Sequence, residues 1–65
     1  MSPERCTEAR EIALTAAGIS AADVAREASE GHESGAYSFV FYSDEIGTAE
    51  IARVLVTASD VGEVL

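Results

Sequence analysis

Apolar residues recur at helical spacing in the first part of the chain. They lie on one face of a helix, whereas most charged residues of the segment lie elsewhere, and the apolar set is Cys6, Ala9, Ile12, Ala13 and Ala16. Ser2, Pro3 and Glu4 form a typical helix start, with a capping hydroxyl, a first-turn proline and a carboxylate at the positive end of the dipole. Gly18 is a typical C-terminal stop. The pattern predicts a helix from about Pro3 to Ala17.

A second helix is predicted to begin at Ser20, because Asp23 stands at the third position after this cap, as in a capping box. Its apolar stripe consists of small residues, namely Ala21, Val24, Ala25 and Ala28. The following segment, 31–35, has the composition of a loop. Since alanine side chains bury little apolar area, two such helices alone would make a weakly stabilised domain.

The clearest strand covers about residues 36–43. Its side chains alternate between two faces; one face carries Tyr37, Phe39 and Phe41, and the other carries Ser38, Val40 and Tyr42. All the aromatic residues of the chain, two tyrosines and two phenylalanines, lie in this strand. We therefore expect it to be the centre of the core, with both phenylalanines buried.

The segment after this strand fits two structures. Thr48 is a suitable cap, and the apolar residues that follow have helical spacing, which favours a C-terminal helix over about 48–58. The alternative is a second strand at 50–57 that forms a β-hairpin with the first. We favour the helix, because a strand would place Arg53 between Ile51 and Leu55 on one face. The predicted fold is α+β, with two N-terminal helices, one central strand and this C-terminal helix in a single domain over residues 1–65.

A chain of 65 residues buries only roughly 60% of its unfolded surface, so its stability is marginal without a staple. The single cysteine excludes an intramolecular disulfide, and Cys6 and His32 are too few to form a zinc site of about four ligands. Association of subunits is the remaining means of stabilising the domain. In addition, the favoured helix leaves a lone strand, whose backbone groups would need the same strand of a second copy. We therefore expect a homodimer.

The net charge is −8, and the only cations are four arginines. Such a surface repels nucleic acid and anionic membranes. No apolar stretch approaches the roughly 20 residues of a membrane span, and the N-terminus has no secretory signal pattern. A free thiol without a disulfide partner fits a reducing compartment. We expect a cytoplasmic protein that binds neither nucleic acid nor membrane.

Candidate chemistry is sparse. Cys6 lies near a helix start, where a thiol can become a nucleophile, but it also belongs to the apolar stripe, and we interpret it as a small core residue. His32 stands among Glu27, Glu30 and Glu33, which could hold a divalent ion or form an ordinary solvated helix end. Its spacing fits no known ligand pattern. We predict no catalytic residue, no metal site and no cofactor.

The sequence thus predicts a non-catalytic protein–protein interaction or regulatory module that binds a second copy and an unidentified protein partner. Two alanine-rich helices cannot bury both faces of the aromatic strand, so the candidate interface residues come from it: Tyr37, Phe39, Val40, Phe41 and Tyr42. The alternative is an acidic mimic of nucleic acid that inhibits a nucleic-acid-binding protein. A mimic needs carboxylates in two phosphate-like rows, whereas an interaction module shows an apolar patch ringed by acids.

Overall fold

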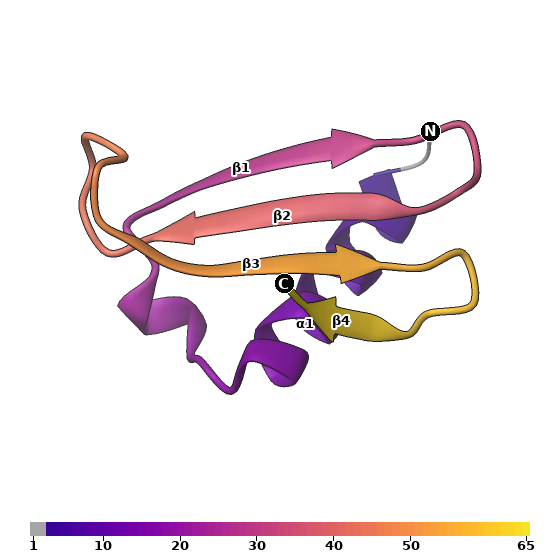
Figure 1. The fold of residues 1–65 in the computed structure, drawn as a ribbon, viewed down its shortest axis with the longest axis horizontal. Helices are drawn as coiled ribbons and strands as arrows, with labels where there is room; N and C mark the ends of the chain where they lie inside the picture. Colours follow the sequence, from indigo (N-terminus) through magenta and orange to yellow (C-terminus); the bar gives the residue numbers. More distant parts are fainter. Residues whose placement is uncertain (1–2) are drawn as a thin grey trace.

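The computed structural model describes residues 3–65 and shows one helix followed by a four-stranded sheet (Figure 1). The helix α1 spans Pro3–Ala17, and a single 3-10 turn, η1, spans Ala21–Asp23. The strands are β1 (Arg26–Gly31), β2 (Tyr37–Tyr42), β3 (Glu50–Val56) and β4 (Gly62–Val64). Each strand is antiparallel to the next one in the chain, so the sheet is a meander.

The helix α1 has the predicted bounds, although the expected cap Ser2 lies outside the described residues. At its end, Gly18 takes a φ of +69°. The N–H groups of Gly18 and Ile19 donate to the carbonyl oxygens of Thr15 and Leu14, both at 3.1 Å. This is the Schellman arrangement, which satisfies the last carbonyl groups of a helix and turns the chain away from its axis.

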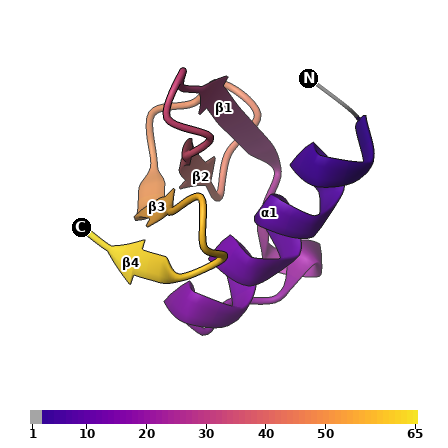
Figure 2. The same cartoon turned by 90° about the vertical axis from the view of Figure 1, so that its right-hand side faces the viewer.

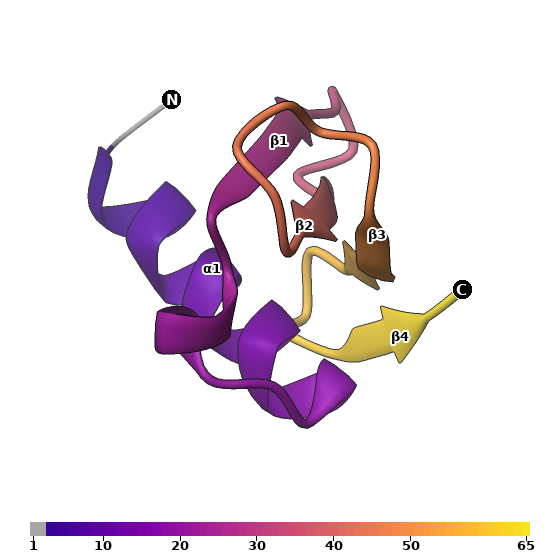
Figure 3. The same ribbon diagram turned by 90° about the vertical axis from the view of Figure 1, so that its left-hand side faces the viewer.

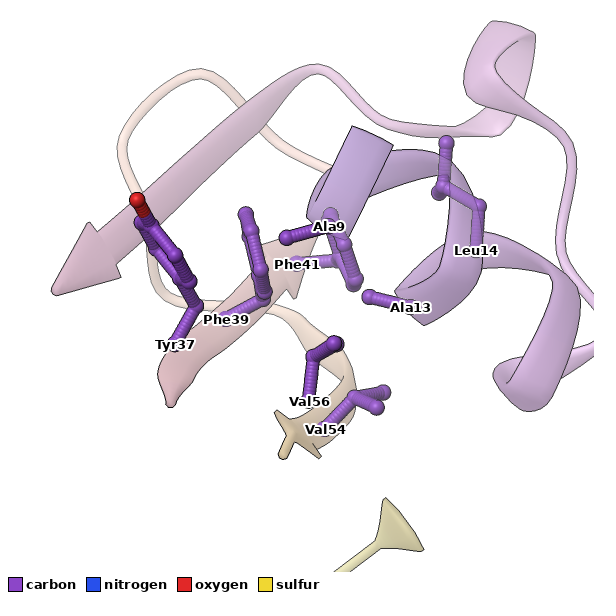
Figure 4. Packing of buried hydrophobic residues seen from close by; sticks show 8 residues of the cluster. All are labelled: Ala9, Ala13, Leu14, Tyr37, Phe39, Phe41, Val54 and Val56. Carbon is purple, nitrogen blue, oxygen red and sulfur yellow. The ribbon is translucent and has the colours of Figure 1, made fainter. Parts of the chain in front are cut away.

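The core is a row of aromatic rings on β2. Tyr37, Phe39 and Phe41 are at most 3% exposed. Neighbouring rings are stacked, with centroid distances of 6.3 Å and 5.9 Å, within the range of favourable aromatic contacts. Figure 4 shows this row facing Ala9 and Ala13 of α1, which are both fully buried. The burial of the two phenylalanines on one face confirms the predicted core.

One face of the sheet is covered by α1 (Figures 2 and 3). The helix packs mainly against β3 and β4, and less against β2. It comes closest to the sheet at Gly62, where a Cβ atom would lie 2.7 Å from the Cβ atom of Ala16 and 3.3 Å from the carbonyl oxygen of Ile12. Position 62 therefore has no room for a side chain unless α1 and β4 move apart.

Arg5 joins the start of α1 to the turn between β3 and β4. Its guanidinium pairs with Asp60 and donates to the carbonyl oxygen of Thr57 at 3.3 Å. It also lies 5.5 Å from the centre of the Tyr37 ring, where the face of the ring attracts a cation. Arg5 thereby closes the Tyr37 end of the aromatic row. Within residues 3–65, no helix is long and apolar enough to cross a membrane.

The second predicted helix is wrong. Ser20 does cap a helical turn, because its side chain accepts the N–H of Ala22 at 3.2 Å, but this turn ends at Asp23 and residues 26–31 form β1. The physical reason lies in β2, whose backbone groups are buried at the centre of the sheet and must be paired on both sides. The ladder with β1 supplies one side, and it outweighs the helix propensity of a short alanine- and glutamate-rich segment.

The predicted C-terminal helix over about 48–58 is also wrong, and the alternative β-hairpin is confirmed. The strand β3 tolerates Arg53 because this side chain points to the face without a helix, where it pairs with Glu50 at 2.7 Å. With β1 and β3 on either side, β2 has both of its partners within one chain. The argument for a homodimer from a lone, unpaired strand is therefore wrong.

We predict that Phe41→Ala unfolds most of the protein at room temperature. Loss of a fully buried phenylalanine costs about 3–5 kcal/mol, which is comparable to the whole stability of a domain of this size. The matched control is Val40→Ala, which truncates the next, half-buried residue on the opposite face of β2 and should cost about 1 kcal/mol. Thermal melts followed by circular dichroism measure both. Equal melting temperatures for the two variants would contradict the placement of the core.

We predict that Gly62→Ala lowers the free energy of unfolding by about 1–3 kcal/mol, because the new methyl group overpacks the contact between β4 and α1. The second substitution Ala16→Gly removes the closest atom that the methyl group would meet. In a double-mutant cycle by urea unfolding, the pair should therefore cost less than the sum of the two single changes. Simple additivity would show that the close approach does not limit position 62.

Candidate functional site

The face of the sheet that points away from α1 has no covering element among residues 3–65 (Figures 2 and 3). We call it the open face. Alternation along the strands, in the observed register, assigns its side chains. From β1 to β4 they are Arg26, Ala28, Glu30, Ser38, Val40, Tyr42, Glu50, Arg53, Leu55 and Glu63, with Glu50 opposite Tyr42 because the register of β3 shifts between Phe41 and Tyr42.

An apolar strip runs across the middle of the open face and consists of Ala28, Val40, Tyr42 and Leu55. Ala28 lies directly opposite Val40 on one side of β2. On the other side Val40 faces Arg53, and Leu55, which lies opposite Ser38, is the diagonal neighbour of Val40. Ala28 is exposed, and the other three side chains are half-buried. A shallow hollow of about 350 Å³ lies beside the strip, between β1 and β2, and it is lined by Ala28, Ser29, Glu30, Ser38 and Val40. The strip is therefore accessible to a partner.

Charged side chains border the apolar strip on both sides. On β1 these are Arg26 and Glu30, and on β3 and β4 they are Arg53 and Glu63. Arg53 is paired with Glu50, and Arg26 donates to a backbone carbonyl oxygen at 3.3 Å. In the described part of the chain, neither Glu30 nor Glu63 has an ion-pair or hydrogen-bond partner. The border thus offers two free carboxylates.

The structure divides the five candidate interface residues between the two faces of β2. Tyr37, Phe39 and Phe41 are buried beneath α1, whereas Val40 and Tyr42 lie on the open face. Sequence reasoning missed Ala28 and Leu55 as part of this surface, because it placed both in helices. The β-branched run at 50–57 was the signal that could have found Leu55, and the segment around Ala28 offered no such signal.

The acidic residues around His32 do not converge. Glu27 lies on the helix side of β1, where Arg10 binds it at 2.7 Å and 2.9 Å, while Glu30 lies on the open face. The Nε2 atom of His32 is 2.7 Å from the hydroxyl oxygen of Ser38. Among residues 3–65, no group of three or more His, Cys, Asp or Glu side chains is placed to hold a metal ion.

The pair of His32 and Ser38 resembles a base beside a nucleophile, but it lacks the rest of such a site. Catalytic pairs of this kind have a third group that orients the imidazole and donors that bind the developing oxyanion. Here both side chains lie at the surface near the β1–β2 turn, and no third side chain of the described residues is hydrogen-bonded to His32. The contact stabilises the end of the hairpin.

The α1 side of the molecule has fewer features of a binding site than the open face. Cys6 is half-buried and packs against the core. A hollow of about 570 Å³, larger than the one on the sheet, runs along α1 and is lined by Glu8, Glu11, Ile12, Thr15 and Ala16. All of these residues come from one side of a single helix, and no second element contributes a group. The open face draws on all four strands, so we take it as the candidate site.

The loop 43–49 joins β2 to β3 and forms one corner of the open face. The carboxylate of Asp44 accepts the N–H groups of Thr48 at 3.0 Å and Ala49 at 2.9 Å, and also the Thr48 hydroxyl. These bonds, the hydroxyl first, favour the charged carboxylate and lower the pKa of Asp44 from 3.8 to about 2. The same loop contacts Arg26, whose guanidinium donates to the carbonyl oxygen of Glu45 at 3.3 Å.

No known protein family, curated protein or solved structure matches this chain.

We predict that Asp44→Asn makes the stability of the protein less dependent on pH between about 4 and 2. The pKa of Asp44 is lower in the folded state, so its contribution is complete above pH 3.8 and is lost as the pH falls through about 2. Thermal melts at a series of pH values compare the parent with Asp44→Asn. The control is Glu45→Gln, which removes a neighbouring charge outside this set of bonds. An Asp44 carboxyl carbon that titrates near 3.8 by NMR would contradict the loop geometry.

Proposed function

We propose that this chain is a non-catalytic protein–protein interaction module, that the open face is its binding surface and that it works as a homodimer. The observation that carries the proposal is the apolar strip bordered by charges on the open face. Protein interfaces commonly combine an apolar centre with a polar rim. In a domain of this size, a sheet face without a covering layer is the surface that gains most from a partner, because burial of its apolar area is favourable.

The charges indicate the chemistry of the partner. All four arginines are already engaged within the chain: Arg5 with Asp60, Arg10 with Glu27, Arg53 with Glu50, and Arg26 with a backbone carbonyl. The net charge of −8 therefore appears at the surface as unpaired carboxylates. Glu30 and Glu63 stand beside the apolar strip. We infer that the partner presents apolar side chains bordered by lysine or arginine, because complementary charges set specificity and association rate.

The alternative, an acidic mimic of nucleic acid, has less support. Several carboxylates are held by groups of the same chain and are not free to stand in for phosphates: Glu27, Asp44, Glu50 and Asp60. On the open face, acids and arginines are mixed around an apolar strip. A mimic requires rows of one sign, because the groove that it occupies is basic.

We predict that Val40→Glu and Leu55→Glu leave the protein folded and weaken binding of the partner at least about tenfold, since each buries a carboxylate in an apolar contact. The matched control is Thr15→Glu, which adds the same charge to an exposed position of α1. The parent and the variants are immobilised in parallel. The partner protein that the immobilised parent captures is then titrated against the parent and against each variant. Circular dichroism verifies folding. Equal binding by Val40→Glu and Thr15→Glu would exclude the open face as the binding surface.

A further inference from the structure

The strand β1 is an edge of the sheet, because β2 is its only neighbour. The N–H of His32 donates to the carbonyl oxygen of Ala36 at 2.9 Å, which makes these two residues a hydrogen-bonded pair of the antiparallel ladder. Hydrogen-bonded and non-hydrogen-bonded pairs alternate along the two strands, so the backbone groups of Glu30 and Ala28 also bond to β2. The backbone N–H and carbonyl groups of Glu27, Ser29 and Gly31 then point away from β2, towards the free edge.

No described element lies along this edge (Figure 1), because α1 packs mainly against β3 and β4. A free row of backbone donors and acceptors is a template for pairing with another strand. Proteins often block such edges with proline, a bulge or inward-pointing charges. The sequence Arg-Glu-Ala-Ser-Glu-Gly of β1 contains no proline, and its register with β2 is regular throughout. Its one inward-pointing charge, Glu27, is bound by Arg10 of the same chain. The edge of β1 is thus open to a further strand.

We propose that two copies of this chain associate by antiparallel pairing of their β1 strands around a twofold axis at Ala28. The pairing joins two four-stranded sheets into one continuous sheet. This inference rests on the proposed function, because it specifies where the homodimer forms. It also places the two open faces side by side, so that the two apolar strips meet at Ala28 of each copy.

The charges of β1 select this register. In an antiparallel ladder between the two β1 strands, the residues whose backbone groups point to the free edge must lie opposite one another. These are alternate residues of the strand, so the twofold axis passes through a residue and not between two residues. An axis at Glu27 or Glu30 would put like charges directly opposite, which is destabilising. Two registers with long overlap remain. One is centred on Ala28 and pairs residues 26–30; the other is centred on Ser29 and pairs residues 27–31.

Only the register centred on Ala28 brings opposite charges together. It places Arg26 opposite Glu30 of the second copy, and the twofold axis repeats this pair. With the axis at Ser29, Glu30 would face an alanine and Arg26 would face His32. Glu30 has no partner within the described chain, and Arg26 makes one long bond of 3.3 Å that occupies a single donor of its guanidinium. Both side chains are exposed and are therefore available to the second copy.

A charge swap tests the pairing by sedimentation equilibrium of the whole chain at micromolar concentration. The parent should sediment at twice the 6.8 kDa of one chain. Arg26→Glu and Glu30→Arg each put two like-charged pairs across the axis and should weaken the dimer by about tenfold or more. The double variant restores opposite charges in reversed order and should regain the affinity of the parent. The control is Glu11→Arg, the same change at an exposed position of α1 outside the open face, which should leave the dimer unchanged.

A disulfide tests the register directly. Across the axis, the two Ala28 residues form a non-hydrogen-bonded pair with Cα atoms about 4.5 Å apart, which is within reach of a disulfide. In a Cys6→Ala background, Ala28→Cys should give a covalent dimer on mild oxidation. Ser59→Cys, in the exposed β3–β4 turn, should not. Circular dichroism of each variant separates lost pairing from lost folding.

The outcomes separate this inference from the proposed function. A dimer that ignores the charge reversals and does not crosslink through Ala28→Cys overturns β1 pairing and leaves the homodimer in place. A folded parent that is monomeric at micromolar concentration overturns both the pairing and the homodimer. Binding of the partner protein by the open face is decided separately, by Val40→Glu against Thr15→Glu.

Discussion

The stacked rings of Tyr37, Phe39 and Phe41 lie along β2 under the small side chains of Ala9 and Ala13, and this contact supports the only core that the described residues contain. Because the chain has one cysteine and no metal-binding cluster among residues 3–65, apolar burial must supply most of its stability. The two alanines let the helix approach the rings, and Gly62 lets β4 approach the helix on the other side. Arg5 then covers the end of the row with a cation over the ring of Tyr37.

The same strand that builds the core also creates the open face. Successive side chains of a strand point to opposite sides, so burial of the three rings sends Ser38, Val40 and Tyr42 away from the helix. The single helix of 15 residues covers one side of the sheet, and the described chain provides no second layer for the other. The apolar side chains of β2 on the open face are half-buried because β2 is a central strand. Side chains of the neighbouring strands cover them from both sides. Their grouping with Ala28 and Leu55 from the neighbouring strands is what makes them a candidate binding surface.

Local signals predicted α1, β2 and the buried phenylalanines, because in these segments the apolar spacing and the C-terminal stop at Gly18 agree with the final packing. They failed for residues 20–31 and 48–58, whose alanine, glutamate and arginine positions also fit a helix. Within them, residues 26–31 and 50–56 form strands because the buried backbone of β2 requires a partner on each side, and this requirement acts between residues far apart in the chain. Arg53 misled the sequence interpretation because a strand places it between the apolar residues Ile51 and Leu55 on one face. That face has no covering element among the described residues, so Arg53 stays exposed. The sequence identified Val40 and Tyr42 as candidates for this surface. It did not identify the residues that β1 and β3 contribute, because these are known only once the strands are paired with β2.

The excess of negative charge limits how this chain can associate with itself. Two copies that each carry −8 repel one another at most orientations, so a stable contact requires a place where opposite charges face each other. The edge strand β4 contributes only Glu63 as a charged residue, whereas β1 carries Arg26 and Glu30 at equal distances on either side of Ala28. An antiparallel twofold arrangement turns that spacing into two complementary pairs and keeps both side chains on the open face. Repulsion elsewhere on the surface then disfavours other contacts between copies, and the remaining carboxylates stay available for the basic partner that we propose.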